Sequence, residues 1–182
     1  MSAIHIVRDY PHPPQKVWRA VTDPELIPLW TATGAGARPE GFSATAGTTF
    51  KFIAKPKPGW SGVVLCEVLE ACEPSLLRYS WQDEGGGEVT EVAYQLAAHD
   101  GGTRFTYHHT GFTGAGGFFM AKILGTVRTG MLTKGLPAVL DEFAPQLVIY
   151  LAGADPFVHD RFGRLGMTKA GLPVGIAIDG PQ

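Results

Sequence analysis

The chain has 182 residues, enough for one domain of ordinary size with a substantial core. Its 15 Lys and Arg residues against 17 Asp and Glu residues give a formal net charge of -2, and neither sign forms a long block, which argues against a nucleic-acid binder. The N-terminus is too polar for a signal peptide and no apolar run reaches the ~18 residues of a membrane span, so we expect a cytoplasmic protein with no membrane span.

The first elements are expected to be a strand and a helix. Residues 4–10 alternate apolar and polar side chains, as a strand does, and the proline-rich stretch that follows ends this pattern. Pro14 suits the start of a helix, in which Val17, Trp18 and Val21 recur at the spacing of one apolar stripe. The helix therefore follows the first strand directly.

A second, short helix is predicted next. Thr22 or Asp23 can cap it, Pro24 suits its first position, and a second proline keeps it short. Trp30 anchors this connector through its large apolar ring. Residues 31–47 are rich in Gly and Ala and offer little to bury, so we expect a loop there.

From residue 48 to residue 110 the hydrophobic period changes to two, which is typical of strands. The expected strands are 48–52, 62–73, 76–82, 89–98 and 103–110. Turn sequences rich in glycine join several of them over short distances. Short connections between consecutive strands predict an antiparallel meander.

The two cysteines, Cys66 and Cys72, fall in one of these expected strands. Six residues of strand span about 20 Å, whereas a disulfide needs Cα atoms less than ~7 Å apart. Neither cysteine has a second metal ligand at close spacing. We therefore expect reduced cysteines and no zinc site.

A long helix is expected at 118–143, where apolar residues return to helical spacing at Met120, Leu124, Val127 and Met131. Three glycines each lower its helix propensity by about 1 kcal/mol, and Pro137 should kink or restart it. Its stability must come from packing against the sheet. We therefore expect residues 1–143 to form one domain.

Residues 144–182 are expected to be a C-terminal extension with a short amphipathic helix near 156–165. The apolar side of this helix is too small to fold alone. The extension is therefore expected to be part of the same domain or of a homodimer contact.

Few motifs point to catalysis, cofactors or metals. The glycine cluster at 111–117 lies between a strand and a helix but lacks the third glycine of a dinucleotide-binding loop, so a simple connection is favoured. His108 and His109 are adjacent in a strand and point to opposite faces, so they cannot chelate one metal together. The strand carboxylates are best explained as solvated residues. We expect no catalytic residue and no cofactor.

Aromatic residues are the most prominent feature of the expected strands. One explanation is a packed core. The other is a cavity, because a curved sheet closed by one glycine-rich helix can enclose a concave apolar space that takes small molecules. The sequence leaves both open.

The order of the elements and several local motifs resemble a known family. The motif residues are Pro14, Val17, Trp18, Ala20, Thr22, Asp23, Pro24, Glu25, Trp30, Gly62, Val64, Glu70, Pro74, Leu77, Tyr79, Trp81, Gly102, Thr103, Phe105, His109, Thr110, Gly111 and Phe112. In this order and spacing, the chain is similar to the activator of heat-shock protein 90 ATPase homologue family of the START/Bet v 1-like (SRPBCC) superfamily. One departure is that Gly130 is followed by Met131 where the family helix usually has Gly-Trp.

The resemblance implies an α+β helix-grip fold, in which a curved antiparallel sheet wraps around a long C-terminal helix and two short helices follow the first strand. Eukaryotic namesakes stimulate the chaperone's ATPase with the help of an additional N-terminal domain. Superfamily relatives bind lipids, sterols, hormones or polyketides, and a few are cyclases or hydrolases. Fold alone does not decide among these functions.

Our first hypothesis is that the protein binds a small apolar or aromatic molecule between the sheet and the C-terminal helix. The alternatives are a chaperone-partner module and, third, a cyclase-like or hydrolase-like enzyme. The expected cavity-lining residues are Trp30, Phe50, Phe52, Tyr79, Trp81, Tyr94, Phe105, Tyr107, His109, Phe112, Met120, Leu124 and Met131.

Overall fold

The computed structural model of the protein describes residues 2–31 and 36–142. The chain divides into one unit up to Ala144 and a second unit from Pro145 to Gln182, and the described residues all belong to the first. The short helix expected near 156–165, and any dimer contact it makes, lie outside the described residues.

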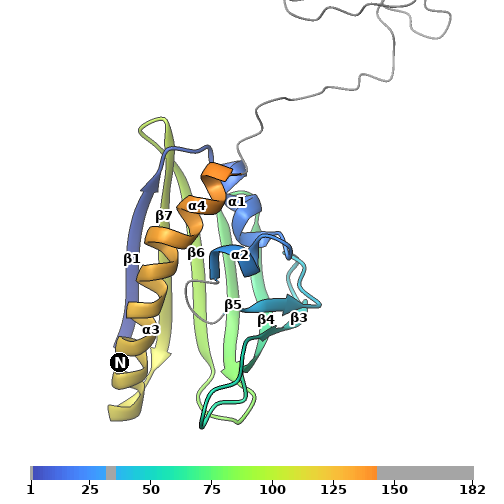
Figure 1. Ribbon diagram of the computed structural model, residues 1–182, viewed down its shortest axis with the longest axis vertical. Helices are drawn as coiled ribbons and strands as arrows, with labels where there is room; N and C mark the ends of the chain where they lie inside the picture. Colours follow the sequence, from blue (N-terminus) through green and yellow to red (C-terminus); the bar gives the residue numbers. More distant parts are fainter. Residues whose placement is uncertain (1, 32–35, 143–182) are drawn as a thin grey trace, which may run out of the picture. The chain divides into compact units, whose positions relative to one another are not determined.

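Seven strands form a single antiparallel sheet (Figure 1). They are β1 (Ser2–Tyr10), β2 (Arg38–Glu40), β3 (Thr49–Ile53), β4 (Val63–Cys72), β5 (Leu76–Asp83), β6 (Thr90–His99) and β7 (Gly102–Phe112). Their order in the sheet is β1-β7-β6-β5-β4-β3-β2, so the strands from β2 to β7 form a meander and β1 pairs with the last of them. The predicted meander is confirmed.

The alternating sequence pattern determines which side chains face inward. In β6, Val92, Tyr94 and Leu96 are buried while the residues between them are more exposed. The turn between β6 and β7 uses Asp100 and Gly101, both with positive φ, as tight hairpin turns require. Because the register is fixed by this turn and by the burial pattern, the rings on the inner face of neighbouring strands come into line.

β2 is an element that the sequence did not predict. Its three residues fall inside the stretch 31–47, which was expected to be a loop, and they pair with β3 at the edge of the sheet. Two of the three side chains are exposed, so the segment carries no alternating apolar signal that could have revealed it.

Two short helices follow β1. Helix α1 (Pro14–Thr22) buries Val17, Trp18, Ala20 and Val21, the stripe expected from their spacing. Helix α2 (Ile27–Thr31) begins later than predicted, because residues 24–26 form a turn in which the Asp23 carboxylate accepts a hydrogen bond from the Glu25 amide at 2.9 Å. Trp30 anchors α2 as expected, and its indole Nε1 donates to the carbonyl of Ala20 at 3.0 Å.

The long C-terminal helix lies across one face of the sheet (Figure 1). It consists of α3 (Gly114–Gly130), a π-helical turn η1 (Met131–Gly135) and α4 (Leu136–Glu142). The helix therefore starts four residues before the expected position. The irregularity predicted at Pro137 takes the form of the wider turn just before it, where the carbonyl of Met131 accepts from the Leu136 amide five residues on.

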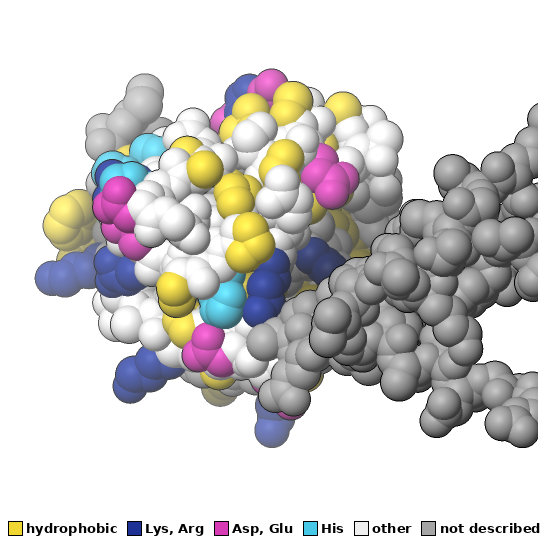
Figure 2. Space-filling view, turned by 90° about the horizontal axis from the view of Figure 1, so that it is seen from above, with side chains coloured by type: hydrophobic (Ala, Val, Ile, Leu, Met, Phe, Trp, Pro, Cys, Tyr) yellow, Lys and Arg dark blue, Asp and Glu magenta, His cyan; other side chains and the backbone are white. Residues whose placement is uncertain are grey.

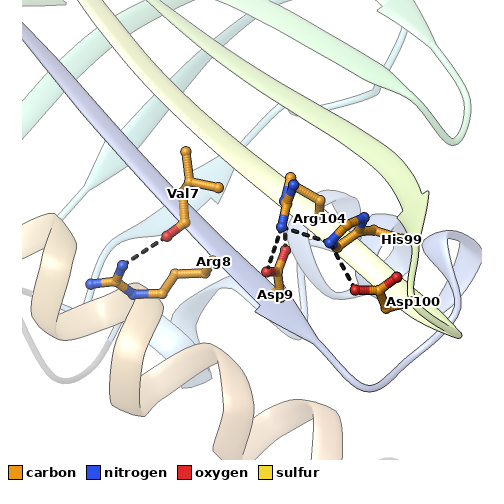
Figure 3. A network of polar contacts seen from close by, with 6 residues as sticks. All are labelled: Val7, Arg8, Asp9, His99, Asp100 and Arg104. Atoms are coloured by element: carbon orange, nitrogen blue, oxygen red, sulfur yellow. Dashed lines mark hydrogen bonds and ion pairs between the residues drawn. The ribbon is translucent and has the colours of Figure 1, made fainter.

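The surface carries charges of both signs. Figure 2 shows acidic and basic side chains scattered over one end of the domain, with small apolar areas between them. Where β1 and β7 pair, Arg104 binds both carboxylate oxygens of Asp9 at 2.9 Å, and His99 lies between Arg104 and Asp100 (Figure 3). No helix among the described residues is long and apolar enough to cross a membrane.

This arrangement of a curved antiparallel sheet, two short helices and a long C-terminal helix confirms the predicted α+β helix-grip fold.

Candidate functional site

The inner face of the sheet is covered with aromatic rings. The predicted cavity residues found there are Phe50 and Phe52 on β3, Tyr79 and Trp81 on β5, Tyr94 on β6, and Phe105, Tyr107, His109 and Phe112 on β7. All except Trp81, which is partly buried, belong to the buried core. Trp30 covers these rings from α2 and is also buried.

These rings form a continuous layer across the strands. Tyr79 contacts Phe50 and Tyr94 edge to face, each at 5.7 Å between ring centres, and Trp81 lies 5.7 Å from Phe52. Tilted and edge-to-face contacts are the arrangements that aromatic rings prefer. The layer is therefore well packed as it stands.

Two separate groups of hydrogen bonds lie within this aromatic layer. The ring nitrogens of His109 bond to the Thr90 hydroxyl at 2.8 Å and to the Tyr107 hydroxyl at 3.1 Å. The hydroxyls of Tyr79 and Tyr94 bond to each other at 2.8 Å. Buried polar groups are satisfied in this way, because an unpaired polar group in an apolar interior costs free energy.

Burial keeps the titratable members of this interior neutral. It raises the pKa of Tyr107 to about 12 and that of Cys66 to about 12, and it also raises the pKa values of Tyr79 and Tyr94. Burial lowers the pKa of His109 to about 3. Near pH 7 the tyrosines and the thiol are therefore protonated and the imidazole is uncharged.

Arg128 of α3 is a charged residue within this neutral interior. Only 8% of its surface is exposed. Its guanidinium carbon lies 4.9 Å from the centre of the Trp81 ring, a cation–π contact, and its Nη1 points at the sulfur of Met131 at 3.4 Å. Its Nε has no hydrogen-bond partner among the described residues.

Arg128 remains charged in spite of its burial. Burial is the largest single influence and opposes the charge, but the combined electrostatic effect of Tyr107, Tyr79 and Tyr94, with a hydrogen bond to Tyr107, raises the pKa of the guanidinium above its usual value. The buried residues of the described chain include no Asp or Glu. The ion pairs of the described residues instead join more exposed groups, as between Arg78 and its partners Glu70 and Glu91.

A small cavity lies beside Arg128. Its volume is about 20 Å³, room for about one water molecule. Its lining residues are Val21, Ile27, Trp30, Thr31, Ala37, Phe42, Phe52, Leu77, Tyr79, Trp81, Tyr94 and Arg128. Most of the predicted rings are buried against one another, so for these rings the packed-core explanation describes the structure.

The cavity brings together only part of the predicted set. Trp30, Phe52, Tyr79, Trp81 and Tyr94 line it. The other predicted strand residues and Met131 are buried in the core around it, and Leu124 packs against that core.

Met120 was expected to line the interior, and this expectation is wrong, because 49% of its surface is exposed. The N-terminal part of α3 is apolar on every side, so spacing alone did not identify its inner face. The inward positions include Ala121 and Arg128, with Leu124 between them.

Sequence reasoning missed Arg128. The available signal was its register: it follows Ala121 by seven residues and Leu124 by four, which places it on the same helix face. This signal can be used only once packing has identified that face as the inner one, because α3 also carries Lys122, Thr126 and Thr129.

The outer face of the sheet carries a much larger but open hollow of about 1100 Å³. Outward-facing residues such as Lys51, Glu67, Ser80 and Gln82 line it, and these belong to alternate positions of β3, β4 and β5. On the same side of β7, His108 stacks on His5 of β1 at 4.4 Å, so the adjacent histidines do face opposite ways. Residues 2–31 and 36–142 contain no group of three or more side chains that could hold a metal ion.

Solved structures with the same fold are found in several bacteria. Protein MLL2253 from Mesorhizobium loti is 26% identical, with a TM-score of 0.66 over 78% of this chain and 98% of its own. A protein from Rhodobacter sphaeroides is 21% identical, with a TM-score of 0.66 over 78% and 93%. DynU16, described as a protein in the dynemicin biosynthetic locus, is 19% identical, with a TM-score of 0.63 over 78% and 48%.

No functionally curated protein matches the chain. The model of one protein family does match, over residues 11–141, and it is described as Activator of Hsp90 ATPase homolog 1-like protein. This match covers most of the domain, including both short helices, the sheet from β2 to β7 and nearly all of the C-terminal helix. The chain therefore belongs to the Activator of Hsp90 ATPase homolog 1-like protein family.

Proposed function

We propose that this protein binds a small, largely aromatic or apolar molecule in the interior between its sheet and its C-terminal helix. The observation that carries the proposal is the buried cation Arg128 beside a cavity lined by aromatic rings. Small-molecule sites are mostly apolar and contain a few polar groups that orient the ligand. The paired hydroxyls of Tyr79 and Tyr94, which also line the cavity, are groups of this kind.

Binding requires the cavity to grow, because about 20 Å³ holds no organic ligand. One wall is the sheet, whose ladder of hydrogen bonds resists displacement. The opposite wall includes α2, a helix of five residues, and Phe42, which belongs to no helix or strand. Movement of α2 and rotation of the Phe42 ring would enlarge the space and leave the sheet intact.

Binding is better supported than catalysis. A cyclase or hydrolase needs a group that can donate or accept a proton near neutral pH. The described interior has no buried carboxylate, and the lowered pKa of His109, about 3, keeps its imidazole neutral at pH 7, so this residue is a weak base and has no imidazolium proton to donate. We therefore place the enzyme alternative behind binding.

Native mass spectrometry of the purified full-length chain tests the proposal. We expect a mass excess that disappears on denaturing extraction and identifies the bound molecule. Ala37→Phe places a ring in the cavity from its wall and should remove the mass excess. Ala97→Phe, at an exposed position of β6, should keep the mass excess. A bare mass for the wild type, even after incubation with a library of small aromatic molecules, would contradict the proposal.

Stimulation of a chaperone ATPase is the second candidate function. The family match supports it, and so does an exposed apolar surface on α3 formed by Phe118, Phe119, Met120 and Ile123. Exposed apolar patches often mark protein contacts. The test is the ATPase rate of the heat-shock protein 90 from the same cell, and no increase at saturating protein would eliminate this candidate.

A further inference from the structure

We propose that the molecule bound in the interior carries a carboxylate, and that Arg128 is the residue that binds it. This inference rests on the proposed function and extends it by naming the chemical class of the ligand. It concerns one charged group, which the packing of the described domain leaves without a counter-charge.

The geometry of Arg128 leaves part of its guanidinium available. One face lies against the Trp81 ring, Nη1 points at the Met131 sulfur, and the guanidinium also hydrogen-bonds to the Tyr107 hydroxyl, so these contacts hold the group in place. A thioether sulfur is a weak acceptor, and Nε has no acceptor among the described residues. Arg128 also lines the cavity, so a ligand there is within its reach.

The surroundings supply no negative charge. The ionisable groups nearest to Arg128 in the interior are Tyr79, Tyr94, Tyr107, His109 and Cys66, and all of them are neutral near pH 7. A buried charge without a partner is costly, and proteins normally pair such charges. An anionic ligand would complete the pair that the described domain lacks.

The number of charges indicates the kind of anion. Arg128 is the only Lys or Arg among the buried residues of the described chain. A single guanidinium balances a singly charged carboxylate, which it binds through two parallel hydrogen bonds, whereas a phosphate with close to two charges would remain half compensated. The neighbouring rings of Phe52 and Trp81 favour an aromatic or flat apolar body attached to this carboxylate.

The experiment compares matched probes on matched proteins. Isothermal titration calorimetry at pH 7 would measure binding of benzoate and 2-naphthoate, and of their neutral primary amides, to the full-length wild type and to Arg128→Gln. The acid and its amide have nearly the same shape, so the comparison isolates the charge. Arg104→Gln serves as the control, because Arg104 is an exposed arginine already paired with Asp9.

We expect the wild type and Arg104→Gln to bind at least one acid about tenfold or more tightly than its amide, the effect of a hydrogen-bonded charge pair. Arg128→Gln should lose this preference and keep its affinity for the amide. Equal binding of acid and amide by the wild type would overturn the carboxylate inference and leave the proposed function standing. A preference that survives in Arg128→Gln would overturn the role of Arg128.

The wild type could also bind none of the four probes at millimolar concentration. This result would contradict the proposed function itself, and the inference with it. If Arg128→Gln does not fold, the comparison of acid and amide on the wild type still decides whether the site prefers a negative charge.

Discussion

The C-terminal helix packs on the domain in two very different ways. In η1 and α4 the inner positions are apolar, and Leu132, Leu136 and Leu140 are almost completely buried. One turn earlier, the inner position is Arg128, buried beside a cavity with no acidic partner among the described residues. The first region has the composition of a stable core, and the second does not.

The two regions contribute to stability in opposite ways. Burial of leucine side chains stabilises the fold, by about 1.5 to 3 kcal/mol for each fully buried side chain. Burial of an unpaired charge opposes folding. Sequences depart from the most stable choice mainly at functional sites, which is why we assign the binding role to the Arg128 region.

The largest change in the free energy of unfolding is expected where the C-terminal helix buries leucine side chains. Leu136→Ala should lower the free energy of unfolding by about 2 to 5 kcal/mol, because it leaves a cavity at a position with 0% exposure. Urea unfolding followed by circular dichroism measures this loss. Ile123→Ala, on the same long helix but 60% exposed, should change stability by less than about 0.5 kcal/mol. Similar losses for the two variants would show that burial of Leu136 does not stabilise the fold as described.

The next largest effect is a loss of stability at acid pH that is caused by His109 in the aromatic layer. His109 has a pKa of about 3 in the folded protein, against an ordinary value of 6.5. Between these values the unfolded chain takes up a proton that the folded chain does not, so this residue makes stability fall as the pH drops from 6.5 toward 3. At pH 4.5 its share of the loss relative to pH 7 is about 2 to 3 kcal/mol.

His109→Gln removes this titration and keeps polar atoms near Thr90 and Tyr107. The loss of unfolding free energy between pH 7 and pH 4.5 should therefore be smaller in the variant by that amount, as urea titrations at both pH values would measure. All other titrating groups are common to the two proteins and cancel in the comparison. An identical pH dependence would mean that the folded imidazole does accept a proton near pH 6.

The smallest expected effect has the opposite sign. Arg128→Met replaces the unpaired charge with an apolar side chain of similar length, so the protein without ligand should be as stable as the wild type or more stable by about 1 kcal/mol. The lost contact with Trp81 works against this gain. Thermal unfolding of both proteins provides the measurement, and a clear loss of stability would identify Arg128 as a structural residue of the described domain.

Much of the fold could be predicted from the sequence because its signals are local. The alternation in β3 to β7, the turn at Asp100 and Gly101 and the stripe of α1 each depend on neighbouring residues. β2 was not predicted, because its pairing with β3 depends on the sheet and not on its own three residues.

The site was harder to predict than the fold. Aromatic alternation identified the rings around the cavity, such as Trp81 and Tyr94, but not the space left between them, which depends on how closely α2 and Phe42 approach. In α3, apolar residues lie on several sides, so their spacing did not identify the inner face. Met120 was therefore predicted to line the cavity, and Arg128 was overlooked. Tertiary packing, not spacing, decides which side of such a helix is buried.

Binding of a ligand in the interior can be tested directly with the four tryptophans as position markers. Each indole N–H gives one signal in a nitrogen–proton correlation spectrum, and Trp30 and Trp81 line the cavity, whereas Trp18 and Trp60 do not. Titration with 2-naphthoate should shift the signals of Trp30 and Trp81, and leave Trp18 and Trp60 nearly unchanged. Shifts confined to Trp18 and Trp60, or no shift in any of the four at millimolar naphthoate, would contradict binding in the interior.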